Sequence, residues 1–539
     1  MRHLILALLL GAFAFTARAE FLQKTVQQIA LTDARLPAAV LIEAAATPWL
    51  HAEPGPVPDL QVFAVESDGA TWLGGPEGAA RFDPKARHVW DRWQFFAGPR
   101  WLQDNFVRNI VVDESATGRR VWIRTDTGAS LIEWRPITLA RKAASFEELI
   151  ERHHVRYGFV ADCRLRESGN LETSYTIDND NDGLWTAMYL AAQSYRYAVT
   201  GEPEARKRAS RAFEAIVRLL DITGHPGFPA RSFVATGERH DNGEWHPTPD
   251  GKWLWKGDTS SDESVGHYYG HALFFDLAAD DAQKTTIRRV IRAMTDHLIA
   301  NDYDLLDLDG EPTRWGQWSE RYFATEEGRY ERALRSMQLL AFLRIAEHVT
   351  GDTKYARAYE DRVRRGYADF IAEYRRWPDG GEINFSDDEL AFLSLDPLLR
   401  YEHDPALRSK YLESVRFIWG EVRPDLNPLW NYISAAAGAG RLTRSLRSDS
   451  ILTLERIPWL PLEWSVRNSR RIDVRLQPQA DRFGRFEIQE TLPPDERQQH
   501  KWNGNPYVPD GGGDGRYLEC GTYFLLPYWM GRHHGWIKD

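Results

Sequence analysis

The stretch from Lys256 to His271 reads KGDTSSDESVGHYYGH and gathers charged, histidine and tyrosine side chains in one loop and the helix predicted after it. Ser261 or Asp262 is suited to cap that helix, because a short oxygen side chain accepts from the free N–H groups of the first turn. Residues at four-residue steps share one face of a helix, and here they are Glu263, His267 and, less squarely, His271. Two interpretations are open: a capped helix with its histidines satisfied in the core, or a helix that brings polar groups to a functional site.

Outward from this stretch, from about residue 143 to 456, helices of two kinds alternate. Residues 183–199 are apolar on most sides, which is typical of a helix buried all round, whereas residues 203–222 carry one apolar stripe. Matching joints, VTGEP at 199–203 and VTGDT at 349–353, put Gly after one helix and an acid before the next. We therefore predict a mainly α fold, an (α/α)6 toroid. Its expected inner helices lie near residues 183, 264, 330, 387 and 427, and its outer helices near 203, 280, 353, 405 and 443, with a helix at 144–156 in front.

The chain before the toroid contains a short repeat. TWLG at 71–74 and VWIR at 121–124 each begin a strand–turn unit in which a Gly lies six residues after the Trp. The first unit resembles the repeats of the sensor propellers of two-component regulators, and the residues that carry the likeness are Asp68, Gly69, Trp72, Gly75 and Gly78. Two copies are too few to close a ring, so we expect a propeller-like remnant.

The domain boundaries follow from these patterns. We predict a signal peptide at 1–19, a leader of low order at 20–57, propeller-like repeats at 58–140, the toroid at 141–457, and C-terminal strands and a tail packed on the toroid at 458–539.

The N-terminus and composition indicate the compartment. A basic start, an apolar run from Leu4 to Phe15 and the small-residue site ARA predict export to the periplasm or the medium, and the run is shorter than the ~20 residues that span a bilayer. We expect no membrane span after signal cleavage. A net charge of −11 argues against nucleic acid as a partner. Cys163 and Cys520 are the only cysteines, and an exported pair favours a disulfide.

Long loops before the inner helices carry the unusual residues. Because all inner helices of a toroid start at one end, these loops should converge there, and free helix N-termini suit carboxylates and anionic ligands. The alternative, that acids before helices are ordinary caps, explains single aspartates but not the basic and aromatic residues on the same rim. The residues we expect to bind substrate are Arg231, Lys256, His271, Arg314, Trp315, Trp318, Asp387, Asp388, Trp430, His500 and Trp502.

A resemblance narrows the enzyme class. An exported helical toroid with DNDNDGLW at 178–185, SSDE…GHYY at 260–269 and PTRWGQW at 312–318 resembles the (α/α)6 glycoside hydrolases and polysaccharide lyases. The likeness covers about residues 143–456. It implies an enzyme that acts on a poly- or oligosaccharide, an acidic one included, and needs no cofactor.

Two mechanisms compete at these loops. A hydrolase needs two carboxyl groups, which Asp180 or Asp182 and Asp262 or Glu263 would supply, with Asp387 or Asp388 as a third. A lyase needs a cation to neutralise a uronate and a base for its proton. Arg231, Arg314 and Lys256 would supply the cation, and His267, Tyr268 or Tyr269 the base. Acids outnumber bases at these loops, which favours hydrolysis. A non-catalytic glycan-binding or sensor module remains a third hypothesis, suggested by the propeller-like repeats.

Two further sites are predicted. Asp178, Asp180 and Asp182 alternate as in the first half of a calcium loop, although Tyr189 stands where the loop requires a bidentate Glu. The tail at 495–505 holds a polar and aromatic cluster that we expect to join the cleft, and its members are Asp495, Arg497, His500, Trp502 and Asn505.

Overall fold

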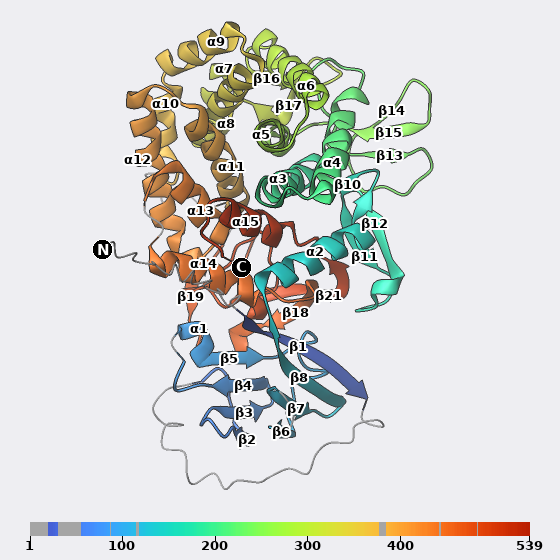
Figure 1. The fold of residues 1–539 in the computed structure, drawn as a ribbon, viewed down its shortest axis with the longest axis vertical. Helices are drawn as coiled ribbons and strands as arrows, with labels where there is room; N and C mark the ends of the chain where they lie inside the picture. The colour runs from blue at the N-terminus through green and yellow to red at the C-terminus, as the bar shows by residue number, and fades with distance from the viewer. Residues whose placement is uncertain are drawn as a thin grey trace, which may run out of the picture.

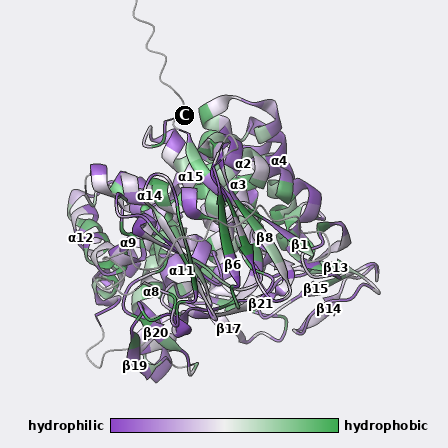
Figure 2. Ribbon diagram, turned by 90° about the horizontal axis from the view of Figure 1, so that it is seen from below, coloured by the Kyte–Doolittle hydropathy of each residue, from purple (hydrophilic) through white to green (hydrophobic). Residues whose placement is uncertain are grey.

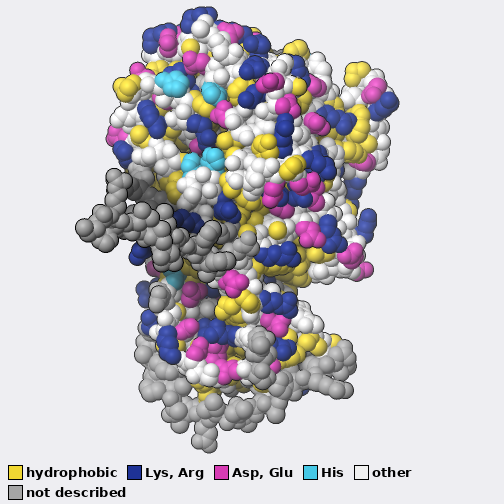
Figure 3. Space-filling view, viewed as in Figure 1, with side chains coloured by type: hydrophobic (Ala, Val, Ile, Leu, Met, Phe, Trp, Pro, Cys, Tyr) yellow, Lys and Arg dark blue, Asp and Glu magenta, His cyan; other side chains and the backbone are white. Residues whose placement is uncertain are grey.

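The computed structural model describes residues 20–30, 55–86, 88–114, 118–376, 384–440, 443–481 and 483–538. The predicted signal peptide at 1–19 lies outside these residues. A helical domain stands above two β-sheets, as Figure 1 shows. Basic and acidic side chains are interspersed over the face seen in Figure 3. No helix in the described ranges is long and apolar enough to cross a membrane.

Six inner helices form a closed ring inside six outer positions (Figure 1). The inner helices touch in the order α3, α5, α8, α11, α13, α15 and back to α3. They are α3 (Asp182–Thr200), α5 (Ser261–Leu277), α8 (Glu326–Thr350), α11 (Phe385–Tyr401), α13 (Pro428–Ala437) and α15 (Thr522–His533). The outer helices are α2 (Leu139–His153), α4 (Pro203–Asp221), α6 (Asp281–Ala300), α9 (Thr353–Arg364) with α10 (Tyr367–Phe370), α12 (Pro405–Val422) and α14 (Arg444–Arg456).

The predicted contrast between the two kinds of helix is confirmed. Every residue of α5 from Glu263 to Phe274 is buried. The outer helix α4 buries one stripe instead, and Figure 2 shows hydrophilic and hydrophobic turns alternating along it. The predicted glycine stops are Gly201 and Gly351, with φ of 66° and 69°, a left-handed conformation that glycine adopts without steric cost.

The sixth inner helix comes from the tail, which the sequence-based boundary at residue 457 had left outside the toroid. Helix α15 packs on α3, α13 and the outer helix α2. All residues from Thr522 to Gly531 are buried, and Pro527 lies inside the helix. A short helix with no polar face and an internal proline gives no helical period in the sequence, which is why it read as an irregular tail.

Two four-stranded antiparallel sheets make up the N-terminal part. One has the order β2 (Val62–Val65), β3 (Thr71–Gly75), β4 (Gly78–Phe82) and β5 (Trp93–Phe96). The other has the order β1 (Phe21–Ala30), β8 (Gly128–Ile137), β7 (Arg120–Arg124) and β6 (Asn109–Asp113). A short helix, α1 (Val89–Arg92), precedes β5. Each predicted Trp–Gly unit therefore lies in a separate sheet. Two such sheets in the described residues do not make a closed propeller.

Strand β1 corrects the predicted leader of low order. It pairs with β8 from Phe21 opposite Ile137 to Ala30 opposite Gly128. Its sequence, FLQKTVQQIA, is polar and its partner lies about a hundred residues further on, so local pattern alone did not indicate a strand. The rest of the predicted leader, residues 31–54, lies outside the described residues.

A third four-stranded sheet joins the tail to the start of the helical domain. Its order is β12 (Ser174–Ile177), β11 (Asp162–Leu165), β21 (Asp510–Leu518) and β18 (Leu462–Arg467). The smaller strands pair as β9 (Val155–Arg156) with β10 (Phe159–Val160), β13 (Phe233–Ala235) with β15 (Trp253–Lys256), β15 with β14 (Trp245–Pro247), β16 (Asp304–Leu306) with β17 (Pro312–Gln317), and β19 (Leu476–Ala480) with β20 (Phe486–Ile488). A short helix, α7 (Glu320–Phe323), precedes α8.

The predicted disulfide is not formed. Cys163 and Cys520 are both free, buried thiols in the described part of the chain. Cys163 on β11 lies opposite Leu518, two residues before Cys520. The Cys520 sulfur instead lies 3.1 Å from the Thr522 hydroxyl. The prediction was right that the two ends of the helical domain meet, but hydrogen bonds of the sheet join them.

Candidate functional site

The inner helices all start at the same end of the ring, because each alternates with an outer helix that returns the chain. Four of these starts carry acidic residues in the first turn, at α3, α5, α8 and α11. This end of the ring is where the sequence predicted the site.

Glu389, like Asp182 and Glu263, is a buried acid with a carboxyl oxygen that lacks a hydrogen-bond partner among the described residues. It lies on α11 and is 1% exposed, and the oxygen without a partner is Oε1. Burial, together with the nearby charge of Asp262, raises the pKa of its carboxyl to about 8, against the opposing charge of Lys501. At neutral pH this carboxyl keeps its proton.

Asp262 lies in the first turn of α5, is half-buried, and is close enough for its charge to raise the pKa of Glu389. Burial raises its pKa, but Arg231 and Arg335 both favour its charged form. Asp387, in the first turn of α11, joins the same cluster. Burial raises the pKa of Asp387 to about 7, while Arg335 opposes that rise. The three carboxyl groups therefore have different tendencies to ionise, which is how paired acids divide a proton donor from a charged partner.

The cations around this cluster are held by other contacts. Arg335 is buried on α8, and its Nε and Nη2 donate to Glu331 at 2.9 and 2.6 Å. Arg231 lies 3.3 Å from the Asn181 Oδ1. Lys501 comes from the tail; its Nζ lies 3.0 Å from the Tyr517 hydroxyl and 4.6 Å from the ring centre of Trp185.

The aspartates of the predicted calcium loop turn to separate partners. Asp178 accepts from the backbone N–H of Asp241 at 3.0 Å, and Asp180 pairs with the Lys256 ammonium at 2.5 Å. Asp182 is fully buried and accepts from Arg156 at 2.6 Å. Within the described ranges no group of three or more His, Cys, Asp or Glu could hold a metal ion. The calcium site stays a prediction.

Asp182 differs from a free catalytic carboxylate, because two side chains already bind one of its oxygens. The Ser232 hydroxyl donates to the same oxygen that Arg156 binds. Burial raises its pKa to about 6, while Arg156 opposes that rise. Its contacts tie the start of α3 to the strand region around Ser232.

The polar face of α5 turns into the packing between helices. The Glu263 Oε1 accepts from the backbone N–H of Gly183 at 3.0 Å, and a Cβ at Gly183 would lie 2.0 Å from the Glu263 Oε2. His267 is fully buried, 3.8 Å from the Glu263 carboxylate. The His271 Nδ1 lies 2.6 Å from the His267 carbonyl. We predicted catalytic or binding roles for these three residues, but the structure places them between α5, α3 and α4.

The side chain of Tyr268, predicted as a proton carrier, packs against the outer helix α6 and the inner helix α8. Its hydroxyl lies 2.8 Å from the Thr295 hydroxyl of α6, and its ring stacks on Phe342 with centres 4.1 Å apart. Tyr269 is also buried, at 1% exposed. The structure therefore places both tyrosines in the hydrophobic core.

The residues that were predicted to bind substrate in the next loops fall into two groups, those that are buried and those that reach the surface. Trp318 is fully buried and its Nε1 donates to Gln338 at 2.8 Å, so it packs rather than lines a surface. Asp388 is buried and paired with Arg375, with the Tyr374 hydroxyl donating at 2.9 Å. The exposed Arg314 and half-buried Trp315 stack on each other, with the guanidinium 4.6 Å from the ring centre.

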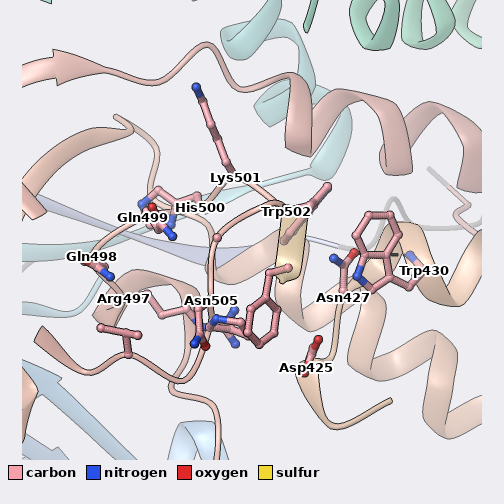
Figure 4. Close-up of a pocket in the computed structure, with 14 residues that line it drawn as sticks. Asp425, Asn427, Trp430, Arg497, Gln498, Gln499, His500, Lys501, Trp502 and Asn505 are labelled. Atoms are coloured by element: carbon pink, nitrogen blue, oxygen red, sulfur yellow. Dashed lines mark hydrogen bonds between the residues drawn. The ribbon is translucent and has the colours of Figure 1, made fainter. Parts of the chain in front are cut away.

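The tail lines a pocket together with the starts of α11 and α13. Figure 4 shows Asp425, Asn427 and Trp430 across from His500 and Arg497. The lining residues are Phe385, Asp425, Asn427, Trp430, Arg497–Trp502, Gly504–Pro506 and Val508. Trp430 stacks on Phe392 with ring centres 4.6 Å apart, which fixes its orientation. Of the predicted tail cluster, Asp495 lies outside this lining and pairs with Lys24 and Arg456 instead.

Some residues of the cluster were missed at the sequence level. Glu389 stands third in the run Asp387–Glu389, and only the first two were weighed. Lys501 directly follows the predicted His500. Arg335 lies in the middle of α8, where an arginine between apolar residues gives no signal of its direction. An acid one turn inside a helix that is predicted to be buried, as Glu389 is, is a signal that the sequence does offer, because acids are rarely buried without a partner.

Comparison with known proteins gives distant likenesses only. No protein-family model matches the chain, and no curated protein matches it. Among solved structures, a sugar epimerase from a ruminal bacterium has a TM-score of 0.41 at 11% identity, over 74% of this chain and 99% of that one. A single-mutant thermostable endoglucanase from Alicyclobacillus acidocaldarius has a TM-score of 0.41 at 10% identity, over 87% and 98%. The family 9 endoglucanase J30 has a TM-score of 0.39 at 11% identity, over 89% and 99%. At these scores the functional conclusion rests on the residues of this chain.

Proposed function

We propose that the protein is an exported enzyme that hydrolyses glycosidic bonds of a poly- or oligosaccharide, with Glu389 as the proton donor and Asp262 as its charged partner. The observation that carries the proposal is a buried carboxyl group, Glu389, that lacks a partner on Oε1 among the described residues. Near it lies a second carboxyl group, Asp262, whose pKa burial raises while two arginines oppose that rise. A raised pKa on one acid and an ionised second acid is the arrangement that glycoside hydrolysis requires.

In this mechanism each carboxyl group has one task. Glu389 gives its proton to the oxygen of the departing sugar as the glycosidic bond breaks. The Asp262 carboxylate either removes a proton from the attacking water or attacks the sugar carbon itself. Arg231 and Arg335 stabilise the charge on Asp262 before the reaction.

Elimination is less well supported. It requires a base near the C5 proton of a uronate, but the Tyr268 hydroxyl is already hydrogen-bonded to Thr295, and His267 lies beside Glu263 in the packing of α5. Hydrolysis uses the neighbouring carboxyl groups of Glu389 and Asp262. Elimination would need a base other than Tyr268 or His267.

A panel of plant, algal and bacterial polysaccharides tests the proposal, with new reducing ends and ultraviolet absorbance both recorded. We expect reducing ends without the absorbance of an unsaturated uronate. Glu389→Gln and Asp262→Asn should each lose at least ~100-fold of the activity, the usual size of an acid–base contribution. The matched control is Glu413→Gln, an exposed glutamate on the outer helix α12.

Three outcomes would contradict the proposal. Absorbance that grows with the reducing ends would indicate a lyase. Activity that survives both carboxyl substitutions would place the chemistry elsewhere. Glycan binding without any cleavage would indicate a binding module.

A further inference from the structure

The tail pocket holds hydrogen-bonding groups that nothing in the described protein satisfies. The Arg497 Nη2, both ring nitrogens of His500 and the Trp502 Nε1 are buried and lack a hydrogen-bond partner among the described residues. His500 and Trp502 are 5% and 8% exposed. Unsatisfied buried polar groups cost free energy, so a cluster of them around one pocket indicates a ligand that completes their hydrogen bonds.

These groups are held in place for binding. The rings of His500 and Trp502 both lie 5.9 Å from the ring of Tyr523, at the start of α15. The His500 backbone N–H donates to Glu519 at 3.2 Å. The Arg497 Nε donates to the Leu492 carbonyl at 2.6 Å, which fixes the guanidinium, while the buried Nη2 has no partner among the described residues. A site held this rigidly loses little entropy when a ligand binds.

The free groups are mostly donors. Arginine and the tryptophan indole can only donate, and a neutral histidine donates from one nitrogen. Burial lowers the Arg497 pKa to about 10, which leaves it positive at neutral pH. Asp425 is the acid in the lining, and its Oδ1 already accepts from the Tyr507 hydroxyl at 2.6 Å. Donors around one cation fit a carboxylate, which offers only acceptors, better than a neutral hydroxyl.

The pocket adjoins the carboxyl cluster. Phe385 lines the pocket and lies one helical turn before Glu389 on α11, so the two share a face. Lys501 belongs to the pocket lining, and its positive charge opposes the rise in the pKa of Glu389. Figure 4 shows its side chain extending away from the other labelled residues. A sugar whose carboxylate occupies the pocket would thus lie next to the glycosidic bond that Glu389 protonates in the proposed mechanism.

We infer that the tail pocket is the carboxylate-binding part of a subsite for a uronic-acid residue, and that this carboxylate binds Arg497, His500 and Trp502. This inference rests on the proposed function for the rest of the substrate. It makes the favoured substrate a glycan that contains uronate, cleaved by hydrolysis next to the acidic sugar.

Calorimetry on the full-length Glu389→Gln protein tests the inference, because this variant binds without turnover. The probes are oligogalacturonates, oligomers of mannuronate and glucuronate-containing oligosaccharides, with cello-oligosaccharides as neutral probes and sulfated carrageenan oligosaccharides, which carry no carboxylate, as second anionic probes. We expect at least one uronate series to bind. Arg497→Lys and Trp502→Phe, added to it, should each weaken that binding ~10-fold or more. The control Arg124→Gln changes an exposed arginine of β7.

The outcomes separate this inference from the proposed function. Tighter binding of neutral oligosaccharides than of every uronate would overturn the subsite but leave hydrolysis standing. Binding of the sulfated probe alone, or of no probe, would overturn it as well. Uronate binding that both pocket variants leave unchanged, with their melting temperatures unaltered, would place the carboxylate elsewhere. Uronate binding through Arg497 without cleavage by the unmodified protein would support the subsite and refute the hydrolase.

Discussion

Replacing Glu389 by glutamine should stabilise the protein at neutral and alkaline pH while it removes activity. In the unfolded chain this carboxyl loses its proton near its ordinary pKa of 4.5, whereas in the folded protein it keeps the proton until pH about 8. Between these values the folded state binds more protons than the unfolded state, so stability falls as the pH rises. The stabilising contribution of the buried acid is therefore complete below pH ~4.5 and lost above pH ~8.

The pKa sets an upper limit on this effect. A rise from 4.5 to about 8, at ~1.4 kcal/mol for each pKa unit, corresponds to a ceiling of ~5 kcal/mol. Side-chain relaxation and water that enters the site reduce such penalties in real proteins. We expect the glutamine variant to gain ~1–3 kcal/mol over the unmodified protein at pH ~8.5, and close to nothing at pH ~4.5.

Urea unfolding of both proteins at several pH values measures the difference. Glu413→Gln is again the control, because that glutamate is exposed and its substitution should shift stability little at any pH. An equal difference between Glu389→Gln and the unmodified protein at all pH values would refute the reasoning. So would a gain that is largest in acid.

The other predictions concern the partner acid, the core tyrosine and the thiols. Asp262→Asn removes a charge that raises the pKa of Glu389, so any residual activity should fall off with rising pH earlier than in the unmodified protein; an unmoved alkaline limb would show that the two acids do not interact. Tyr268→Phe should cost ~1 kcal/mol of stability and less than ~10-fold in activity, and a ~100-fold loss in steady-state rates would return it to the mechanism. Thiol titration of the unfolded, unreduced protein should find both Cys163 and Cys520 reactive, and a protein without reactive thiols would contain the disulfide after all.

The arrangement of helices was readable from the sequence because burial leaves a pattern. Helices surrounded by others are apolar on all sides, and helices on the outside keep one stripe, so their alternation predicted a ring. Helix α15 gave no such pattern, since it is short, wholly buried and interrupted by Pro527. Strand β1 could not be found because its partner is distant in sequence.

The sequence predicts which helix ends lie together, but not which side chains point to one another there. The starts of the inner helices do meet, and Asp262, Asp387 and Arg231 lie together there. In a helix buried all round, however, the sequence does not indicate which face points to the centre of the ring. Neighbouring helices decide that direction, and they turn Glu263 and Tyr268 into the packing while Glu389 lies near the charge of Asp262.

A crystal structure of the Glu389→Gln protein with a bound oligosaccharide tests the pairing of Glu389 and Asp262 most directly. We predict a glycosidic oxygen within hydrogen-bond reach, ~2.6–3.2 Å, of the side chain at position 389, with the Asp262 carboxylate on the opposite side of that bond. An oligosaccharide bound at this end of the ring with no glycosidic oxygen near either side chain would contradict the account.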